Sequence, residues 1–298
     1  MMTIYDLKGK FTYAMHGCGA YRGILHSNSA EAFDYWRLGG ANIFEIDVAL
    51  ASDGHHVAVA HGLTDDYLRH WEIYKYPPQE ERTSEWFCSQ KYCRYSSKGL
   101  TTMSVADVIN RMKNDSDVIV VFDLYNLWSA AAAAFAREIE KLIDKCDSLW
   151  DRILIECYFQ DQVEVVNVVN PRIHVIFCVN DKAAQQYKVE ETSIERLKSL
   201  GVEFVSYPWK YSRGEEDIKR YGDKGMAVMS LTHTNLHSRK LRNAGVNINN
   251  VDIRFKGLDF IWMIPVYLIG RIRYYSVKVY DHYLRRFINE KDTDVRSI

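Results

Sequence analysis

Short apolar runs alternate along the chain with longer segments whose apolar residues recur at helical spacing. The runs have the length and composition of buried strands. They lie at residues 11–16, 41–50, 117–124, 152–158, 173–179, 202–207, 225–232 and, more weakly, 249–254. This alternation of strand-like and helix-like segments is typical of repeated βα units.

The helical pattern is clearest at residues 28–40, 129–146, 193–201 and 235–245. The first of these segments begins with a capping residue, Asn28 or Ser29, and ends at two glycines, which are start and stop signals for a helix. Eight strands with intervening helices over about 250 residues predict an α/β fold of the (β/α)8 TIM-barrel type. A doubly wound open sheet is the competing architecture.

Two segments fall outside this repeat. Residues 62–100 are rich in Tyr, Trp, Pro and charge, and we expect them to form an insertion after the second strand, with a functional role. The second segment follows residue 254. The expected organisation is a barrel domain over residues 1–254, with the insertion at about 62–100, and an aromatic and basic C-terminal extension over residues 255–298.

The strongest chemical signal is the stretch "IFEIDVALASDGHHVAVAH" at residues 43–61. Side chains two positions apart on a strand share a face, so Glu45 and Asp47 should project together. The Asp-Gly turn that follows predicts an antiparallel return strand, which places His61 near the same end. Two carboxylates so close repel each other unless a cation lies between them. Taken alone, the pair could also be the exposed face of an antiparallel strand.

A third carboxylate is placed to complete a cation site. Asp123 ends the apolar run at residues 117–124 just before a loop and a helix. Acidic residues at the carboxyl ends of barrel strands are typical of active sites, although Asp123 alone could also cap the following helix. Oxygen ligands of this kind suit one divalent ion, Mg²⁺ or Ca²⁺.

Two histidines are predicted at the same rim. His16 ends the first apolar run, and His61 ends the return strand. Beside a cation held by carboxylates, one imidazole can activate the nucleophile while the other protonates the leaving oxygen of a phosphate diester. Glu156 could contribute to the surroundings of the cation, or be a partnered polar residue inside the barrel.

These residues lie in motifs that resemble the glycerophosphodiester phosphodiesterase superfamily, including its bacterial members with a His-Gly start and the related spider-venom-type phospholipases D. The motifs are "HGCGAYRGILHSNSAEAF", "GGANIFEIDVALASDGHHVAVAHG", "KGLTTMSVADVINRM" and "VVFDLYN", within roughly residues 11–130. The resemblance implies a (β/α)8 barrel, a Mg²⁺ or Ca²⁺ ion on Glu45, Asp47 and Asp123, and His16 and His61 as the general acid/base pair.

Two positions depart from the family pattern. Many members carry Arg directly after the first histidine, where this chain has Gly17, and Lys two residues after the third acid, where it has Tyr125. Arg22 could supply positive charge from the same loop, and Tyr125 could donate one hydrogen bond to phosphate without a charge. Trp209, at a strand end, is expected either to line the substrate cleft or to be an ordinary rim tryptophan.

Composition indicates the cellular compartment and the class of partner more than it indicates the chemistry. The chain has 298 residues, is 47% hydrophobic and has a formal net charge of −1, so nucleic acid is not an expected partner. Its first residues lack the pattern of a secretory signal, and its six cysteines lack CxxC spacing. We therefore expect a cytoplasmic protein with reduced thiols.

The C-terminal extension differs in charge from the rest of the chain. Residues 254–287 carry seven Lys/Arg and two Asp/Glu, which leaves the chain before them acidic. The apolar stretch at 260–270 is too short to cross a bilayer of roughly 30 Å as a helix. Contact with the inner face of the membrane, helices packed on the barrel, and a homo-oligomer contact all remain open.

The sequence thus predicts a metal-dependent phosphodiesterase of lipid metabolism that hydrolyses a glycerophosphodiester, a lysophospholipid or a similar phosphate diester. Attack by a hydroxyl of the substrate to give a cyclic phosphate, as in phospholipase D-like transfer, is the alternative reaction. A catalytically inactive barrel that binds a phosphate ligand or a lipid head group is the alternative of another class.

Overall fold

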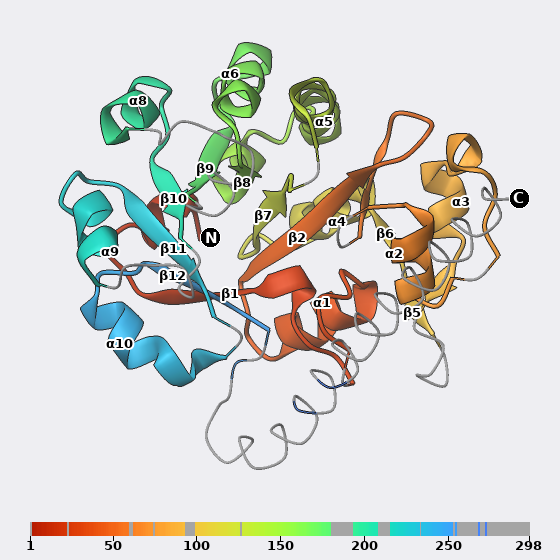
Figure 1. Ribbon diagram of the computed structural model, residues 1–298, viewed down its shortest axis with the longest axis horizontal. Helices are drawn as coiled ribbons and strands as arrows, with labels where there is room; N and C mark the ends of the chain where they lie inside the picture. The colour runs from red at the N-terminus through yellow and green to blue at the C-terminus, as the bar shows by residue number, and fades with distance from the viewer. Residues whose placement is uncertain are drawn as a thin grey trace, which may run out of the picture.

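The computed structural model describes residues 2–22, 24–59, 62–73, 75–92, 99–125, 127–179, 193–207, 215–232 and 234–252, together with 254, 268 and 272. Eight parallel strands form a closed barrel, because β1 pairs with β12 on one side and with β2 on the other (Figure 1). The strands are β1 (Thr12–Met15), β2 (Ile43–Leu50), β7 (Ile119–Asp123), β8 (Ile153–Cys157), β9 (His174–Cys178), β10 (Phe204–Ser206), β11 (Ala227–Leu231) and β12 (Ile248–Val251). The predicted barrel is confirmed, and the open sheet is wrong.

Helices alternate with these strands and surround the barrel (Figure 1). They are α1 (Ala30–Leu38), α4 (Val105–Asn114), α5 (Ser129–Ile143), α6 (Gln160–Val169), α8 (Ile194–Ser199), α9 (Glu215–Gly222) and α10 (Ser238–Asn243). The N-cap of α1 is Ser29, whose hydroxyl accepts a hydrogen bond from the backbone of Ala32 at 3.2 Å. The predicted segment at 235–245 begins with a 3-10 turn, η6 (Asn235–His237), before α10.

The lower half of the barrel interior, at the amino ends of the strands, is apolar. One cluster takes a buried side chain from every strand of the barrel, and a 3-10 turn at the N-terminus, η1 (Ile4–Leu7), adds Ile4 and Leu7 to it. In β2 the inward side chains change from Ile43 to Glu45 and then Asp47 along the strand, because alternate residues face the same way. The upper half of the interior, at the carboxyl ends of the strands, is therefore polar.

The insertion after β2 is folded. Strand β3 (His56–Ala58) returns antiparallel to β2, as the Asp-Gly turn predicts, and the next elements are α2 (Asp65–His70), η3 (Gln79–Glu81), α3 (Ser84–Cys88), β4 (Lys91–Tyr92), β5 (Leu100–Thr101) and β6 (Met103–Ser104). These elements lie beside the barrel in Figure 1 and share a second apolar cluster that includes Leu68, Trp71 and Phe87. This cluster, which also includes Ile24, Ala49 and Ala51 from outside the insertion, explains why the segment adopts regular structure rather than a loop.

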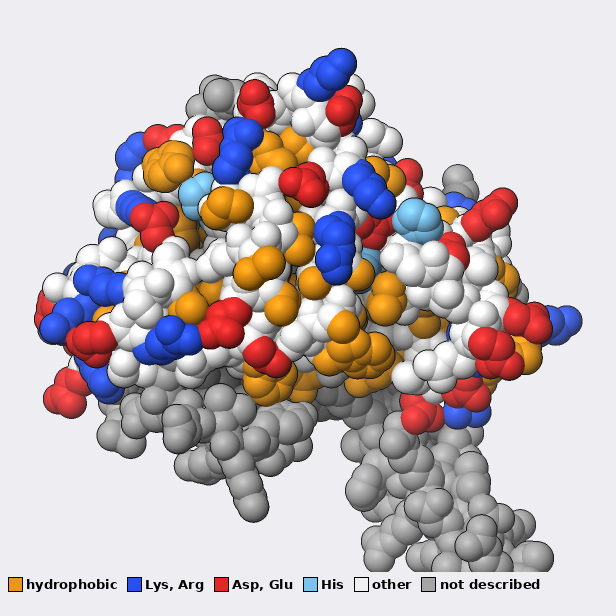
Figure 2. Space-filling model, turned by 90° about the horizontal axis from the view of Figure 1, so that it is seen from above, with side chains coloured by type: hydrophobic (Ala, Val, Ile, Leu, Met, Phe, Trp, Pro, Cys, Tyr) orange, Lys and Arg blue, Asp and Glu red, His pale blue; other side chains and the backbone are white. Residues whose placement is uncertain are grey.

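The boundary between barrel and C-terminal extension remains a prediction, since the extension lies almost entirely outside the described residues. Within the part of the chain that is described, no helix has the length and apolar character needed to cross a membrane. On the face shown in Figure 2, acidic and basic side chains are interspersed, with hydrophobic side chains between them.

A buried arginine joins several parts of the barrel wall. Arg152 ends the turn η4 (Asp147–Arg152), and its guanidinium group is almost inaccessible to solvent. It donates hydrogen bonds to the carbonyl oxygens of Met112, Asp115 and Val118, at 2.8 to 3.3 Å, and to that of Ser148 at 3.3 Å. These carbonyls lie where α4 leads into β7, so Arg152 supplies the donors that this connection lacks.

We expect Arg152→Met to lower the free energy of unfolding by about 3 kcal/mol, because the buried carbonyl groups of Met112 and Val118 and two partly buried ones lose the hydrogen bonds of the guanidinium group. Urea unfolding followed by circular dichroism measures the change. The control is Arg69→Met on α2, which removes an exposed ion pair with Asp66 and should cost under about 0.5 kcal/mol. Equal losses in the two variants would contradict a special role for Arg152.

Candidate active site

The three predicted acids converge at the carboxyl ends of β2 and β7. One oxygen atom of each of Glu45, Asp47 and Asp123 lies within 4.8 Å of the others. Asp47 is the register partner of Asp123 across the two parallel strands. The side chains of Glu45 and Asp47 are buried, so the alternative of an exposed antiparallel face is wrong.

Uncharged donors hold Glu45 and Asp47 in place. The backbone amide of Gly17 donates to Glu45 Oε2 at 2.6 Å. Asn28 makes a two-way contact with Asp47: its amide nitrogen donates to Asp47 Oδ2 at 2.8 Å, and its oxygen accepts the backbone N–H of Asp47 at 3.0 Å. Both donors come from the loop between β1 and α1, which therefore forms one wall of the site.

Asp123 is held from the neighbouring strand end. The phenol of Tyr158 donates to Asp123 Oδ2 at 3.1 Å, and the backbone of Tyr125 also donates to the carboxylate. Asp123 does not cap the following helix, because the N-cap of α5 is Trp128. Its carboxylate instead lies close to those of Glu45 and Asp47.

Glu156 adds a fourth carboxyl group to this part of the barrel. It lies on β8 in register with Asp123 and is buried. Burial raises its pKa to about 7, although a hydrogen bond from Ser206 and electrostatic attraction to the nearby His16 oppose the rise. Glu156 is thus a partnered polar residue of the barrel interior that belongs to the same group of acids.

The electrostatics of the site favour a bound cation. Burial, followed by repulsion from the neighbouring carboxylates, raises the pKa of Glu45 and of Asp123 well above their usual ranges. Among the described residues, neither Glu45 Oε1 nor Asp123 Oδ1 has a hydrogen-bond partner, although both atoms are buried. Glu45 and Asp123 therefore each have one oxygen atom held by a hydrogen bond and one that is available to a cation. An all-oxygen donor set with these properties fits a hard divalent ion.

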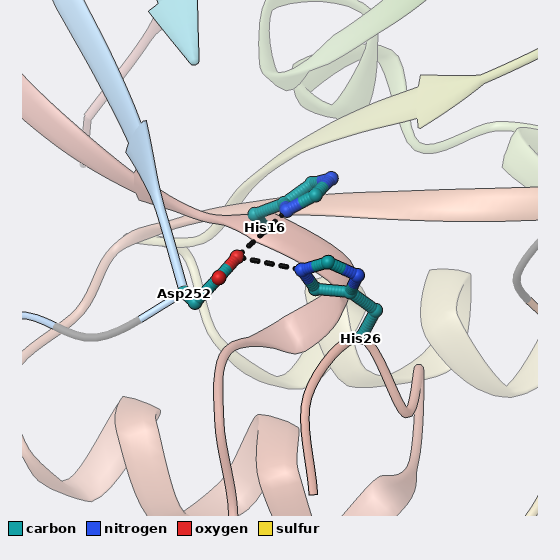
Figure 3. Close-up of side chains that lie close together, drawn as sticks. All are labelled: His16, His26 and Asp252. Atoms are coloured by element: carbon teal, nitrogen blue, oxygen red, sulfur yellow. Dashed lines mark hydrogen bonds and ion pairs between the residues drawn. The ribbon is translucent and has the colours of Figure 1, made fainter. Parts of the chain in front are cut away.

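His16 lies beside the acids, in the 3-10 turn η2 (His16–Cys18) that follows β1. Its Nε2 atom is 3.9 Å from Glu45 Oε2. On the opposite side of the ring, Nδ1 lies 2.8 Å from Asp252 Oδ1 (Figure 3). The structure thus brings His16 together with the predicted carboxylates.

The sequence analysis missed two residues of this site. The Nε2 atom of His26 lies 2.7 Å from Asp252 Oδ1, and its ring centroid is 4.0 Å from that of His16 (Figure 3). Asp252 follows β12 as Asp123 ends β7, so the criterion of an acid at a strand end could have identified it. His26 has no comparable signal, because it lies in a loop whose path the sequence does not predict.

Four predicted site residues remain to be placed: His61, Trp209, Arg22 and Tyr125. His61 and Trp209 lie outside the described residues. Arg22 is exposed, with its guanidinium group 5.3 Å from the centre of the Tyr21 ring. Tyr125 is partly exposed and packs edge-on against Tyr158, with ring centroids 5.3 Å apart, which places it next to the residue that holds Asp123. Their roles in substrate binding remain predictions.

Comparison with known proteins places the fold among solved phosphodiesterases. No family model and no curated protein sequence matches the chain. A structure assigned as a glycerophosphoryl diester phosphodiesterase from Silicibacter pomeroyi is similar with a TM-score of 0.68 and 14% identity, over 84% of this chain and 93% of that one. A glycerophosphodiester phosphodiesterase from Parabacteroides distasonis gives a TM-score of 0.63 and 17% identity, over 82% and 93%.

A phosphodiesterase from Oleispira antarctica, solved in complex with the product sn-glycerol-3-phosphate, is similar with a TM-score of 0.61 and 16% identity, over 83% of this chain and 94% of that one. These likenesses establish a shared barrel fold. They agree with the superfamily whose motifs the sequence resembles.

Glu156 predicts how the free energy of unfolding depends on pH in the absence of divalent ions. Its native pKa of about 7 exceeds the usual 4.5, so the native state holds this proton more tightly than the unfolded state does. Ionising Glu156 therefore lowers the free energy of unfolding as the pH rises from about 4.5 to about 7. Glu156→Gln should gain stability relative to the unchanged protein across this window. Urea unfolding at about pH 5 and about pH 8 measures the gain, and an equal difference at both pH values would contradict it.

Proposed function

We propose that this protein is a metal-dependent phosphodiesterase that cleaves a glycerophosphodiester, a lysophospholipid or a similar phosphate diester. The observation that carries the proposal is the group of three acids at one strand-end rim, directly beside an imidazole, with two buried oxygen atoms that have no hydrogen-bond partner in the described part of the chain. The barrel fold shared with solved phosphodiesterases supports the same reaction class.

Glu45, Asp47 and Asp123 would hold one Mg²⁺ or Ca²⁺ ion. The ion, when bound, would stabilise the negative charge that develops on the phosphate oxygens. The protein contributes the fixed orientation of these acids, since Gly17 and Asn28 each hold one of their oxygens. Such preorganisation means that the site needs little rearrangement during the reaction.

His16 would act in proton transfer. Its Nδ1 atom is engaged by Asp252, which leaves Nε2 as the nitrogen that faces the carboxylates and can accept or donate a proton there. We assign His61 as its partner, because the return strand of the hairpin leads toward the same rim. One imidazole then takes the proton of the attacking hydroxyl or water, and the other protonates the leaving oxygen.

The test is turnover of a panel of glycerophosphodiesters and lysophospholipids with Mg²⁺ or Ca²⁺, followed by phosphorus NMR. We expect Asp123→Asn and His16→Ala to lower kcat at least 100-fold. The matched control, Asp223→Asn at an exposed turn, should retain full activity. Chemical shifts distinguish hydrolysis from a cyclic product. Lack of turnover with every metal ion, or turnover that His16→Ala does not change, would instead favour a barrel that only binds phosphate ligands.

The C-terminal extension would bring the enzyme to anionic membrane surfaces. This part of the proposal rests on the sequence, in which residues 254–287 combine a charge excess of +5 with a Trp- and Tyr-containing apolar stretch. Basic and aromatic residues in this combination suit the membrane interface.

We expect the full-length chain to co-sediment with vesicles that contain anionic lipid, and Arg271→Glu combined with Arg273→Glu to weaken this binding several-fold. Lys141→Glu with Lys145→Glu on the barrel changes the net charge equally and should have little effect. Equal binding of both double variants, or no binding of the unchanged protein, would exclude membrane contact through the extension.

A further inference from the structure

The loop between β1 and α1 has an unusual backbone. Four residues other than glycine adopt positive φ angles in it: Cys18 at 64°, Arg22 at 48°, His26 at 54° and Asn28 at 50°. Residues with a side chain disfavour this conformation, and asparagine tolerates it best among them. Such positions persist where the surroundings fix them, and they concentrate at functional sites.

Two of the four strained positions direct side chains into the site. Asn28 reaches Asp47, as described above, and His26 reaches Asp252. The side chain of His26 is only 9% exposed, and that of Asp252 is fully buried. The contact between them is therefore shielded from water, in which both groups would otherwise be solvated.

Asp252 connects the two histidines through a single oxygen atom. Its Oδ1 lies 2.8 Å from Nδ1 of His16 and 2.7 Å from Nε2 of His26. An ionised carboxylate can only accept hydrogen bonds, so each of these nitrogens carries a proton. The neutral form of His16 then has its lone pair on Nε2, which is the nitrogen turned toward Glu45.

Gly17 makes this arrangement sterically feasible. A Cβ atom at position 17 would lie 2.5 Å from the Cα of His26 and 2.9 Å from its Cβ. No side chain at position 17 is compatible with His26 at its present place. The close approach is to the backbone of residue 26, so a glycine at position 17 is required by the loop path that brings His26 to Asp252.

We propose that His26 and Asp252 are positioning residues of His16. Asp252 fixes His16 in the Nδ1–H tautomer, with Nε2 toward the carboxylates, and His26 fixes the carboxylate of Asp252 by donating to the same oxygen. The kinetic consequence of this inference rests on the proposed function, whereas the tautomer of His16 does not.

The first test is NMR of the full chain with ¹⁵N-labelled histidine, in which ring nitrogen shifts report the tautomer of each of the ten histidines. His16→Gln identifies the signals of His16. We expect the Nδ1–H form of His16 in the unchanged protein, a mixture of tautomers in His26→Ala, and return of the Nδ1–H form in His26→Gln, whose amide can donate to Asp252. The control is His237→Gln in η6, which should leave these signals unchanged.

The second test is the kinetics of the same variants. His26→Ala should lower kcat about 10- to 100-fold with little change in KM, because a misdirected imidazole affects the chemical step more than substrate binding. His26→Gln should recover much of this loss. Thermal unfolding of each variant verifies that it is folded, and if His26→Ala is not, His26→Asn, whose shorter amide tolerates the positive φ angle but cannot take the place of Nε2, replaces it with the same expected loss.

The outcomes separate the two proposals. An Nε2–H tautomer of His16 in the unchanged protein, or an unchanged tautomer in His26→Ala, would overturn the positioning role. Absence of turnover in the unchanged protein would contradict the phosphodiesterase while the tautomer comparison still decides the positioning. If added Zn²⁺ shifts the signals of His16 and His26 together at one equivalent, the cluster is a metal site and the hydrogen-bonded assignment fails.

Discussion

The site depends on placing several carboxyl groups together in the upper half of the barrel, with little water to separate them. The carboxyl groups belong to Glu45, Asp47, Asp123, Glu156 and Asp252. The buried arginines of the described residues, Arg82 and Arg152, bond to backbone carbonyls elsewhere. Apart from the two imidazoles that contact Asp252, repulsion among the acids is therefore left for protons or a bound cation to compensate. A barrel with an apolar lower half can tolerate such a cost, and sites of this kind typically exchange stability for function.

The hairpin of β2 and β3 helps to hold the strand that carries two of these acids. Strand β2 extends beyond the barrel into the hairpin with β3, and the backbone of Val59 donates to the carbonyl of Asp47 at 3.0 Å. At the far end of the hairpin, Glu138 of α5 accepts hydrogen bonds from the backbone and ring of His56, at 3.0 and 2.6 Å. The hairpin is thus fixed to a helix of the barrel, and Asp47 is held from both sides.

The loop after β1 completes the site through backbone conformations that side chains disfavour. It delivers the amide of Gly17 to Glu45, the side chain of Asn28 to Asp47, and His26 to Asp252. A regular helix or strand could not direct these groups to three different carboxylates within so few residues, because its side chains follow a fixed period. The strained backbone of this loop is therefore what allows it to contact three carboxylates of the site.

Local sequence patterns were sufficient for the strands, for the closed barrel and for three of the acids. Alternation in β2 placed Glu45 and Asp47 on one face, and the position of Asp123 at the end of its run placed it at the same rim. These inferences succeed because the period of a strand and its carboxyl end are properties of the segment itself. The folded character of the insertion was not predicted, because its apolar residues are scattered and form a cluster only when several short elements pack together.

Tertiary structure alone decided which groups surround His16. Asp252 is 236 residues away in the chain, and it reaches His16 only because β12 closes the barrel against β1. His26 reaches Asp252 only because the loop adopts positive φ angles and residue 17 has no side chain. The sequence by itself thus determined the barrel and the place of Glu45, Asp47 and Asp123 at one rim, because the periodicity of a strand is a short-range property. The hydrogen-bonded setting of the imidazole depends on long-range closure and on steric contact between backbone segments, which no local pattern encodes.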